Sequence, residues 1–126
     1  MEDNVTLREQ LMGALEELTC VRVVGSCGTE DEAIAWLATS DSWDLLVVDL
    51  FLKQGSGMGL VRRVARRRPE QRVVVFSNYV NAGVRKWCAQ VGVDAVFDKS
   101  TDIDALVDYC ARRCAQLPAP VQPAQA

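Results

Sequence analysis

The sequence predicts a doubly wound α/β domain, in which a parallel β-sheet is covered by helices on both faces. Short apolar runs alternate with segments of helical periodicity along the 126-residue chain. The runs are apolar on both faces of the expected strand, a pattern typical of parallel strands that are buried on two sides. The regular alternation of strand and helix is typical of βα units.

Four segments are predicted to be strands because each contains a short continuous apolar run. They are Val21–Gly25, Asp44–Leu50, Arg72–Ser77 and Asp94–Lys99. An alternation that opens with a helix implies a strand before that helix. Only what would be the acidic end of this strand, Glu2 and Asp3, is present, so we expect its other residues to be missing from the sequence.

Five helices are predicted around these strands. Thr29 and Glu32 form a capping box at the start of the second, and Pro69 and Gly92 end the third and the fourth. The predicted helices are Thr6–Leu18, Thr29–Ala38, Met58–Arg68, Asn81–Val91 and Ile103–Leu117. The arginines of the third helix are expected to form a solvated face. These arginines are Arg62, Arg63, Arg66 and Arg67.

The fold is expected to be one domain over residues 1–117, followed by a disordered tail over residues 118–126 that is rich in proline, alanine and glutamine. A net charge of −3 argues against direct nucleic-acid binding by the domain. No apolar run approaches the roughly 20 residues needed to cross a bilayer, and the N-terminus has no signal pattern, so a cytoplasmic location is expected. The five cysteines are predicted to be reduced packing residues, because they are widely spaced and no histidine accompanies them.

Open parallel sheets bind their ligands at the carboxyl ends of their strands. Polar residues stand at this end of every predicted strand except Val21–Gly25, including the strand whose other residues are missing. These residues are Glu2, Asp3, Asp49, Ser77 and Lys99. Three clustered carboxylates repel one another unless a cation neutralises them, and oxygen ligands suit Mg²⁺. A metal ion beside a lysine also forms a pocket for a phosphoryl group, in which Asp49 is a candidate nucleophile that forms an acyl phosphate.

These motifs resemble those of response regulator receiver domains (CheY-like) in two-component signal transduction systems. Four motifs carry the resemblance in order: ED at residues 2–3, VVDLFL around Asp49, VVVFSN around Ser77 and GVDAVFDKS around Lys99. The resemblance covers residues 2–116. It implies a flavodoxin-like (βα)5 fold that is shortened at its N-terminus, with the first strand largely missing from the sequence.

The resemblance also implies a function for each motif. Asp49 would accept phosphate from a sensor histidine kinase or phosphotransfer protein, Ser77 would hydrogen-bond a phosphoryl oxygen, and Lys99 would pair with the phosphoryl group. Mg²⁺ would be bound by Glu2, Asp3, Asp49 and the backbone carbonyl of Phe51. The domain would be a signalling phosphoacceptor and not an enzyme, beyond self-phosphorylation and self-dephosphorylation. It would act on an output protein, as a monomer or as a homodimer, without contacting a membrane.

The sequence departs from the family pattern beside the lysine. Ser100 follows Lys99 where proline is common, and Val96 stands where many receivers carry an aromatic residue, so no aromatic switch is expected. One alternative function is a degenerate receiver that acts only as a protein-binding or dimerisation module. An aspartyl phosphatase is disfavoured because Phe51 stands where such enzymes place a second aspartate, and a P-loop enzyme is disfavoured because the sequence has no GxxxxGK[ST] motif.

Overall fold

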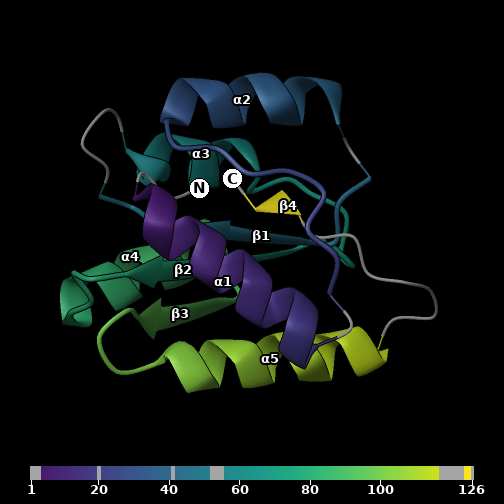
Figure 1. Cartoon of the computed structure of the whole chain (residues 1–126). Coiled ribbons are helices and arrows are strands. Elements are labelled where there is room, and N and C mark those ends of the chain that lie inside the picture. The colour runs from purple at the N-terminus through teal and green to yellow at the C-terminus, as the bar shows by residue number, and fades with distance from the viewer. Residues whose placement is uncertain (1–3, 20, 41, 52–55, 117–123, 126) are drawn as a thin grey trace.

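The computed structural model describes residues 4–19, 21–40, 42–51, 56–116 and 124–125, and these form three layers (Figure 1). A central sheet is covered on one face by α1 (Val5–Leu18) and α5 (Ile103–Gln116). The other face is covered by α2 (Glu30–Thr39), α3 (Gly57–Arg63) and α4 (Ala82–Val91). The doubly wound α/β arrangement predicted from the sequence is therefore confirmed.

The sheet is parallel throughout, with the strand order β3-β2-β1-β4. Its strands are β1 (Leu45–Val48), β2 (Arg72–Ser77), β3 (Ala95–Asp98) and β4 (Ala124–Gln125). Alternate residues of β1 enter two cores: Leu46 and Val48 pack with α2, α3 and α4, whereas Leu45 and Val47 pack with α1 and α5. Burial on both faces explains why the strand is apolar at every position.

The prediction of a strand at Val21–Gly25 was wrong. Only Gly25 makes a β-bridge, and none of the four described strands pairs with the segment along its length. Val21 is nevertheless buried in the same core as α1 and α5, and a Cβ at Gly25 would lie 2.6 Å from Nε1 of Trp36. Apolar burial does not require the ladder of hydrogen bonds that defines a strand, so the segment packs without one.

The edge of β1 that does not face β2 pairs with β4. The two residues of β4 are in parallel register with Leu46 and Val47. The expectation of a disordered tail over residues 118–126 did not include this pairing. The other tail residues lie outside the described residues, so the domain boundary at residue 117 stays a prediction.

The third predicted helix, Met58–Arg68, is shorter in the structure, where α3 ends at Arg63. Arg67 then turns inward, and only 11% of its side chain is exposed. Its guanidinium donates to Asp94 Oδ2 at 2.6 Å and to the carbonyls of Gly92 and Gln71 at 2.8 and 2.9 Å. The expectation that Arg67 faces solvent was therefore wrong. Its N–H groups thus satisfy backbone carbonyls in the loops that precede β2 and β3.

The predicted helix ends are set by local signals. Thr29 caps α2, and its hydroxyl accepts from the N–H of Glu32 at 3.2 Å. Gly92 ends α4 in the left-handed conformation, with φ at 87°, which favours glycine. Within the described part of the chain, none of the helices combines the length and the apolar content that a bilayer crossing requires.

Four of the cysteines are in the described part of the chain. Cys27, Cys88 and Cys110 are free and buried, as expected of packing residues. Burial raises the pKa of Cys110 to about 12, which keeps its thiol protonated at neutral pH. Cys114 takes part in a disulfide, so the expectation that every cysteine is reduced was wrong.

Candidate functional site

Asp49 follows the last residue of β1, and its side chain is almost completely buried, with 7% exposed. Each carboxylate oxygen accepts one hydrogen bond. Oδ1 accepts from the N–H of Phe51 at 3.2 Å, and Oδ2 accepts from Nζ of Lys99 at 2.8 Å. A buried carboxylate requires such partners, because its desolvation is otherwise very costly.

Lys99 follows β3, and its side chain is 6% exposed. Its backbone N–H donates to the carbonyl of Ser77 at 2.9 Å, which joins the ends of β2 and β3. Pairing of Ser77 with Asp98 in the parallel register puts Lys99 one residue beyond the last paired position. The lysine therefore reaches Asp49 across the end of β2.

Ser77 is the last residue of β2 and is completely buried. Its hydroxyl accepts from the N–H of Tyr79 at 3.3 Å, which begins the turn toward α4. The structure thus brings Asp49 and Lys99 into contact and places Ser77 at the strand end between them. We call these three residues the carboxyl-edge site.

The loop after Asp49 folds back against the strand end. The carbonyl of Leu50 accepts from the N–H of Gly57 at 3.1 Å and from the hydroxyl of Ser56 at 3.2 Å. A Cβ at Gly57 would lie only 2.2 Å from the carbonyl oxygen of Asp49, so this position requires glycine. This close approach was not identified from the sequence.

Glu30 is a second residue that sequence reasoning missed. Its Oε2 accepts from the N–H of Ser56 at 2.8 Å, and this bond ties the start of α2 to the loop that follows Asp49. The two residues are 26 positions apart in the sequence. The only local signal is the acidic first turn of α2, which has an ordinary explanation in the helix dipole.

Two exposed aromatic side chains flank the site. Phe51 and Tyr79 are 41% and 66% exposed, and their rings meet edge to face with centroids 5.4 Å apart. Phe51 follows Asp49 by two positions, and Tyr79 follows Ser77 by two. The pair therefore links the loops that leave β1 and β2.

The residues of β3, which precede Lys99, are divided between the two cores. Val96 lies against the core under α4, whereas Phe97 is buried in the other core and meets Tyr109 of α5 edge to face at 5.8 Å. The neighbouring Asp98 accepts from the hydroxyl and the N–H of Ser100, and these bonds lower the pKa of its carboxyl. The single aromatic ring of this strand is thus held against α5.

Part of the predicted Mg²⁺ site lies outside the described residues, because Glu2 and Asp3 are not among them. Within the described ranges, no three His, Cys, Asp or Glu side chains are grouped closely enough to hold a metal ion. Asp49 supplies carboxylate oxygens and Phe51 a backbone carbonyl, which are ligand types that Mg²⁺ accepts. The donor chemistry that is present therefore fits this metal.

Comparison with known protein families decides what kind of domain carries this site. The model of the response regulator receiver domain family matches residues 1–111. The chain belongs to this family. Receiver domains are signalling modules that interact with histidine kinases and output domains, and they are not classical enzymes.

Solved receiver structures share the fold. A CheY-like receiver domain protein from Methanospirillum hungatei JF-1 superposes with a TM-score of 0.77 at 17% identity, covering 91% of this receiver and 90% of that chain. A Burkholderia pseudomallei response regulator was solved with a phosphorylated aspartic acid, a calcium ion and citrate. It superposes with a TM-score of 0.74 at 22% identity, and the match covers 91% of this receiver and 66% of that chain. The Thermotoga maritima regulator DrrB superposes with a TM-score of 0.74 at 19% identity, and this receiver covers only 50% of the length of that chain. At these identities the likeness shows the fold alone.

No curated protein matches the receiver at a significant level. The family and the flavodoxin-like fold predicted from the sequence are confirmed by the family match and by the solved structures.

Proposed function

We propose that this receiver is phosphorylated on Asp49 by a histidine kinase or phosphotransfer protein in a Mg²⁺-dependent reaction, and that it signals through a partner-binding surface. The observation that carries the proposal is the buried ion pair between Asp49 and Lys99, 2.8 Å long, at the carboxyl ends of two parallel strands, β1 and β3, that flank β2. A carboxylate with a fixed cation beside it is the arrangement that phosphoryl transfer to an aspartate requires.

In the proposed reaction, an oxygen of Asp49 attacks the phosphorus atom of a phosphohistidine. The P–N bond breaks with its electron pair left on the imidazole nitrogen, and the new O–P bond makes an acyl phosphate. Lys99 then offsets the charge of the transferred group, since its ammonium already lies against Oδ2. The hydroxyl of Ser77 donates a hydrogen bond to a phosphoryl oxygen, while its oxygen still accepts from the N–H of Tyr79.

The proposed metal ligands are Glu2, Asp3, Asp49 and the backbone carbonyl of Phe51. Bound Mg²⁺ supplies positive charge that offsets the phosphoryl oxygens. Support for a divalent cation comes from the Burkholderia pseudomallei regulator, which was solved with calcium and a phosphorylated aspartic acid.

The proposed output is a shift between two states of the surface formed by α4, β3 and α5. Phosphorylation draws Ser77 toward the phosphoryl group, and Tyr79 follows because its N–H is bonded to the Ser77 hydroxyl. Tyr79 is 66% exposed next to α4, so its movement alters a surface available to a cytoplasmic partner or a second copy.

Incubation with acetyl phosphate and Mg²⁺, followed by intact-mass measurement, tests the proposal. We expect the mass of one phosphoryl group on the wild type, and none on Asp49→Asn or on wild type with excess EDTA. The same mass in all three samples, or no added mass in any, would contradict phosphorylation of Asp49. The second result would favour the alternative of a degenerate binding module.

A further inference from the structure

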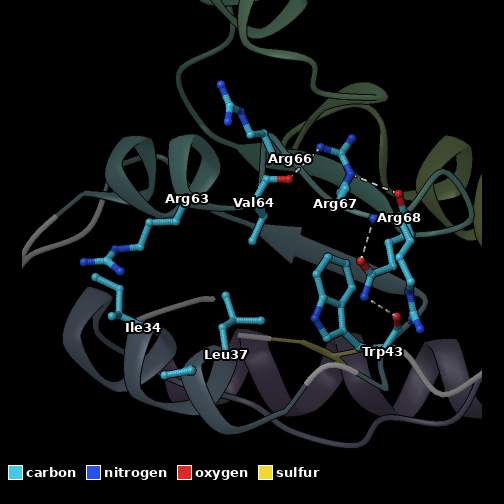
Figure 2. A pocket seen from close by; sticks show the side chains of 10 residues that line it. Ile34, Leu37, Trp43, Arg63, Val64, Arg66, Arg67 and Arg68 are labelled. Atoms are coloured by element: carbon cyan, nitrogen blue, oxygen red, sulfur yellow. Dashed lines mark hydrogen bonds between the residues drawn. The ribbon is translucent and has the colours of Figure 1, made fainter.

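A pocket of about 400 Å³ lies between α2 and the segment that follows α3 (Figure 2). Figure 2 shows Leu37, Val64 and the indole of Trp43 directed into the space between these two segments. The same view shows Arg63 at the end near Ile34, and Arg68 at the end near Trp43. The pocket therefore has an apolar interior and arginines along its rim.

This pocket is separate from the carboxyl-edge site. Trp43 precedes β1 and Gln71 precedes β2, so both lie where these strands begin. Asp49 lies beyond the last residue of β1, at the opposite end of the sheet. A ligand in the pocket would thus not contact the proposed phosphorylation site.

The charge of the pocket is positive and only partly neutralised. No acidic residue is among the described residues that line it. Arg67 is paired with Asp94 at 2.6 Å, and Arg68 with Glu70 at 3.4 Å. Arg63 and Arg66 are exposed and make no ion pair with any described residue.

The neighbouring arginine has a different role. The guanidinium of Arg62 lies over the ring of Trp87, 5.7 Å from its centroid, and so connects α3 to α4. Some arginines of the run at residues 62–68 therefore make contacts within the fold, and others carry a charge that is available to a ligand. Arg63 and Arg66 belong to the second group.

We propose that this pocket binds an acidic peptide segment of a partner protein, with one apolar side chain of that segment inserted against Trp43 and Leu37. The rim arginines are complementary to carboxylates, and the apolar interior is complementary to an anchor residue. Arginine is enriched at the energetic centres of protein interfaces. Trp43 is only 3% exposed and forms part of the apolar floor of the pocket. A nucleic acid fits less well, because the chain carries a net charge of −3 and the pocket is apolar inside.

The test uses the unphosphorylated full chain without Mg²⁺, so that its outcome does not depend on Asp49. The probe is a short fluorescein-labelled peptide with one leucine flanked by glutamates, and binding is followed by anisotropy. We expect saturable binding that weakens as salt is raised. Absence of binding up to about 1 mM peptide would overturn the proposal.

Charge reversal tests the rim. Arg63→Glu combined with Arg66→Glu should weaken binding by about tenfold or more, because like charges then face the glutamates. The matched control, Arg85→Glu combined with Lys86→Glu on the exposed side of α4, makes the same change in net charge and should leave affinity within about twofold. Equal weakening by both pairs of substitutions would mean that affinity depends only on the net charge of the protein, and would overturn the proposal that the peptide binds in this pocket.

Filling the pocket tests its interior. Ala38 is exposed and lines the pocket, whereas Ala35 is exposed on the same helix and does not line it. Ala38→Trp should abolish binding and Ala35→Trp should preserve it, with circular dichroism showing that both variants are folded. The same affinity for both variants would overturn the proposal, as would a single-stranded oligonucleotide that binds more tightly than the peptide and competes with it.

Discussion

Nζ of Lys99 lies 2.8 Å from Oδ2 of Asp49, and both side chains are less than a tenth exposed. The two residues are 50 positions apart and come from the ends of β1 and β3, which are not neighbours in the sheet. The lysine therefore crosses the end of β2 to reach the aspartate. The ion pair is therefore buried and fixed in orientation. A group that becomes attached to the aspartate would change the contact between Asp49 and Lys99.

Removal of the lysine should destabilise the protein because it leaves a buried carboxylate without its cation. We expect Lys99→Met to lower the free energy of unfolding by about 3–5 kcal/mol. Asp49→Asn combined with Lys99→Met should recover part of this loss, since no uncompensated charge remains. Urea denaturation measures both values. Equal stability of the single and the double variant would show that the ion pair is not coupled.

The close approach at Gly57 should make even a methyl group harmful. Gly57→Ala forces the backbone of Asp49 to move, and we expect a loss of about 1–3 kcal/mol together with slower phosphorylation of Asp49. Gly13→Ala is the matched control, because Gly13 is exposed in α1 and a Cβ there meets no atom within 4 Å. That variant should gain about 0.5–1 kcal/mol from helix propensity. Thermal unfolding that fails to separate the two variants would contradict the geometry.

The inward turn of Arg67 predicts a large difference between neighbouring arginines. Arg67→Ala removes bonds to Asp94 and to three backbone carbonyls, those of Val64, Gln71 and Gly92. Asp94 stays largely buried, and among the described residues Arg72, at 3.4 Å, is its remaining ion-pair partner. We expect a loss of about 2–4 kcal/mol for this variant, and a change within about 0.5 kcal/mol for Arg66→Ala. Chemical denaturation of the two variants side by side measures the contrast. Similar losses would mean that the inward position of Arg67 contributes nothing.

The pairing of β4 with β1 predicts a role for the end of the chain. Truncation after Gln116 removes β4 and leaves the edge of β1 beside Leu46 and Val47 without this partner. Exposed edges of apolar strands promote association with other chains. We expect a lower Tm by calorimetry and a larger particle size by light scattering. A truncated protein with unchanged Tm and size would contradict a structural role for β4.

Much of the fold follows from local signals in the sequence. The apolar runs placed β1, β2 and β3 to within about two residues, and Thr29 and Gly92 marked the ends of two helices correctly. These features depend on neighbours within a few positions. The order of polar residues at strand ends was sufficient to select Asp49 and Lys99, because parallel strands bring their carboxyl ends to one edge.

Other features depended on contacts that no local pattern encodes. The segment Val21–Gly25 has the composition of a strand and does not form one, since a strand exists only where another strand supplies its hydrogen bonds. Arg67 belongs to an arginine run that suggested a solvated face, yet Asp94, 27 positions away, holds it inward. Glu30 likewise meets the loop at Ser56 only after the chain has folded.

The sequence by itself determined the fold class, the family and the identity of the residues at the carboxyl edge, because periodicity and strand-end chemistry are local properties. The tertiary structure decided which of those residues touch, which arginines remain available, and what pairs with the edge of β1. These outcomes depend on long-range distances and on burial, and burial determines whether a charge such as that of Asp49 must have a partner.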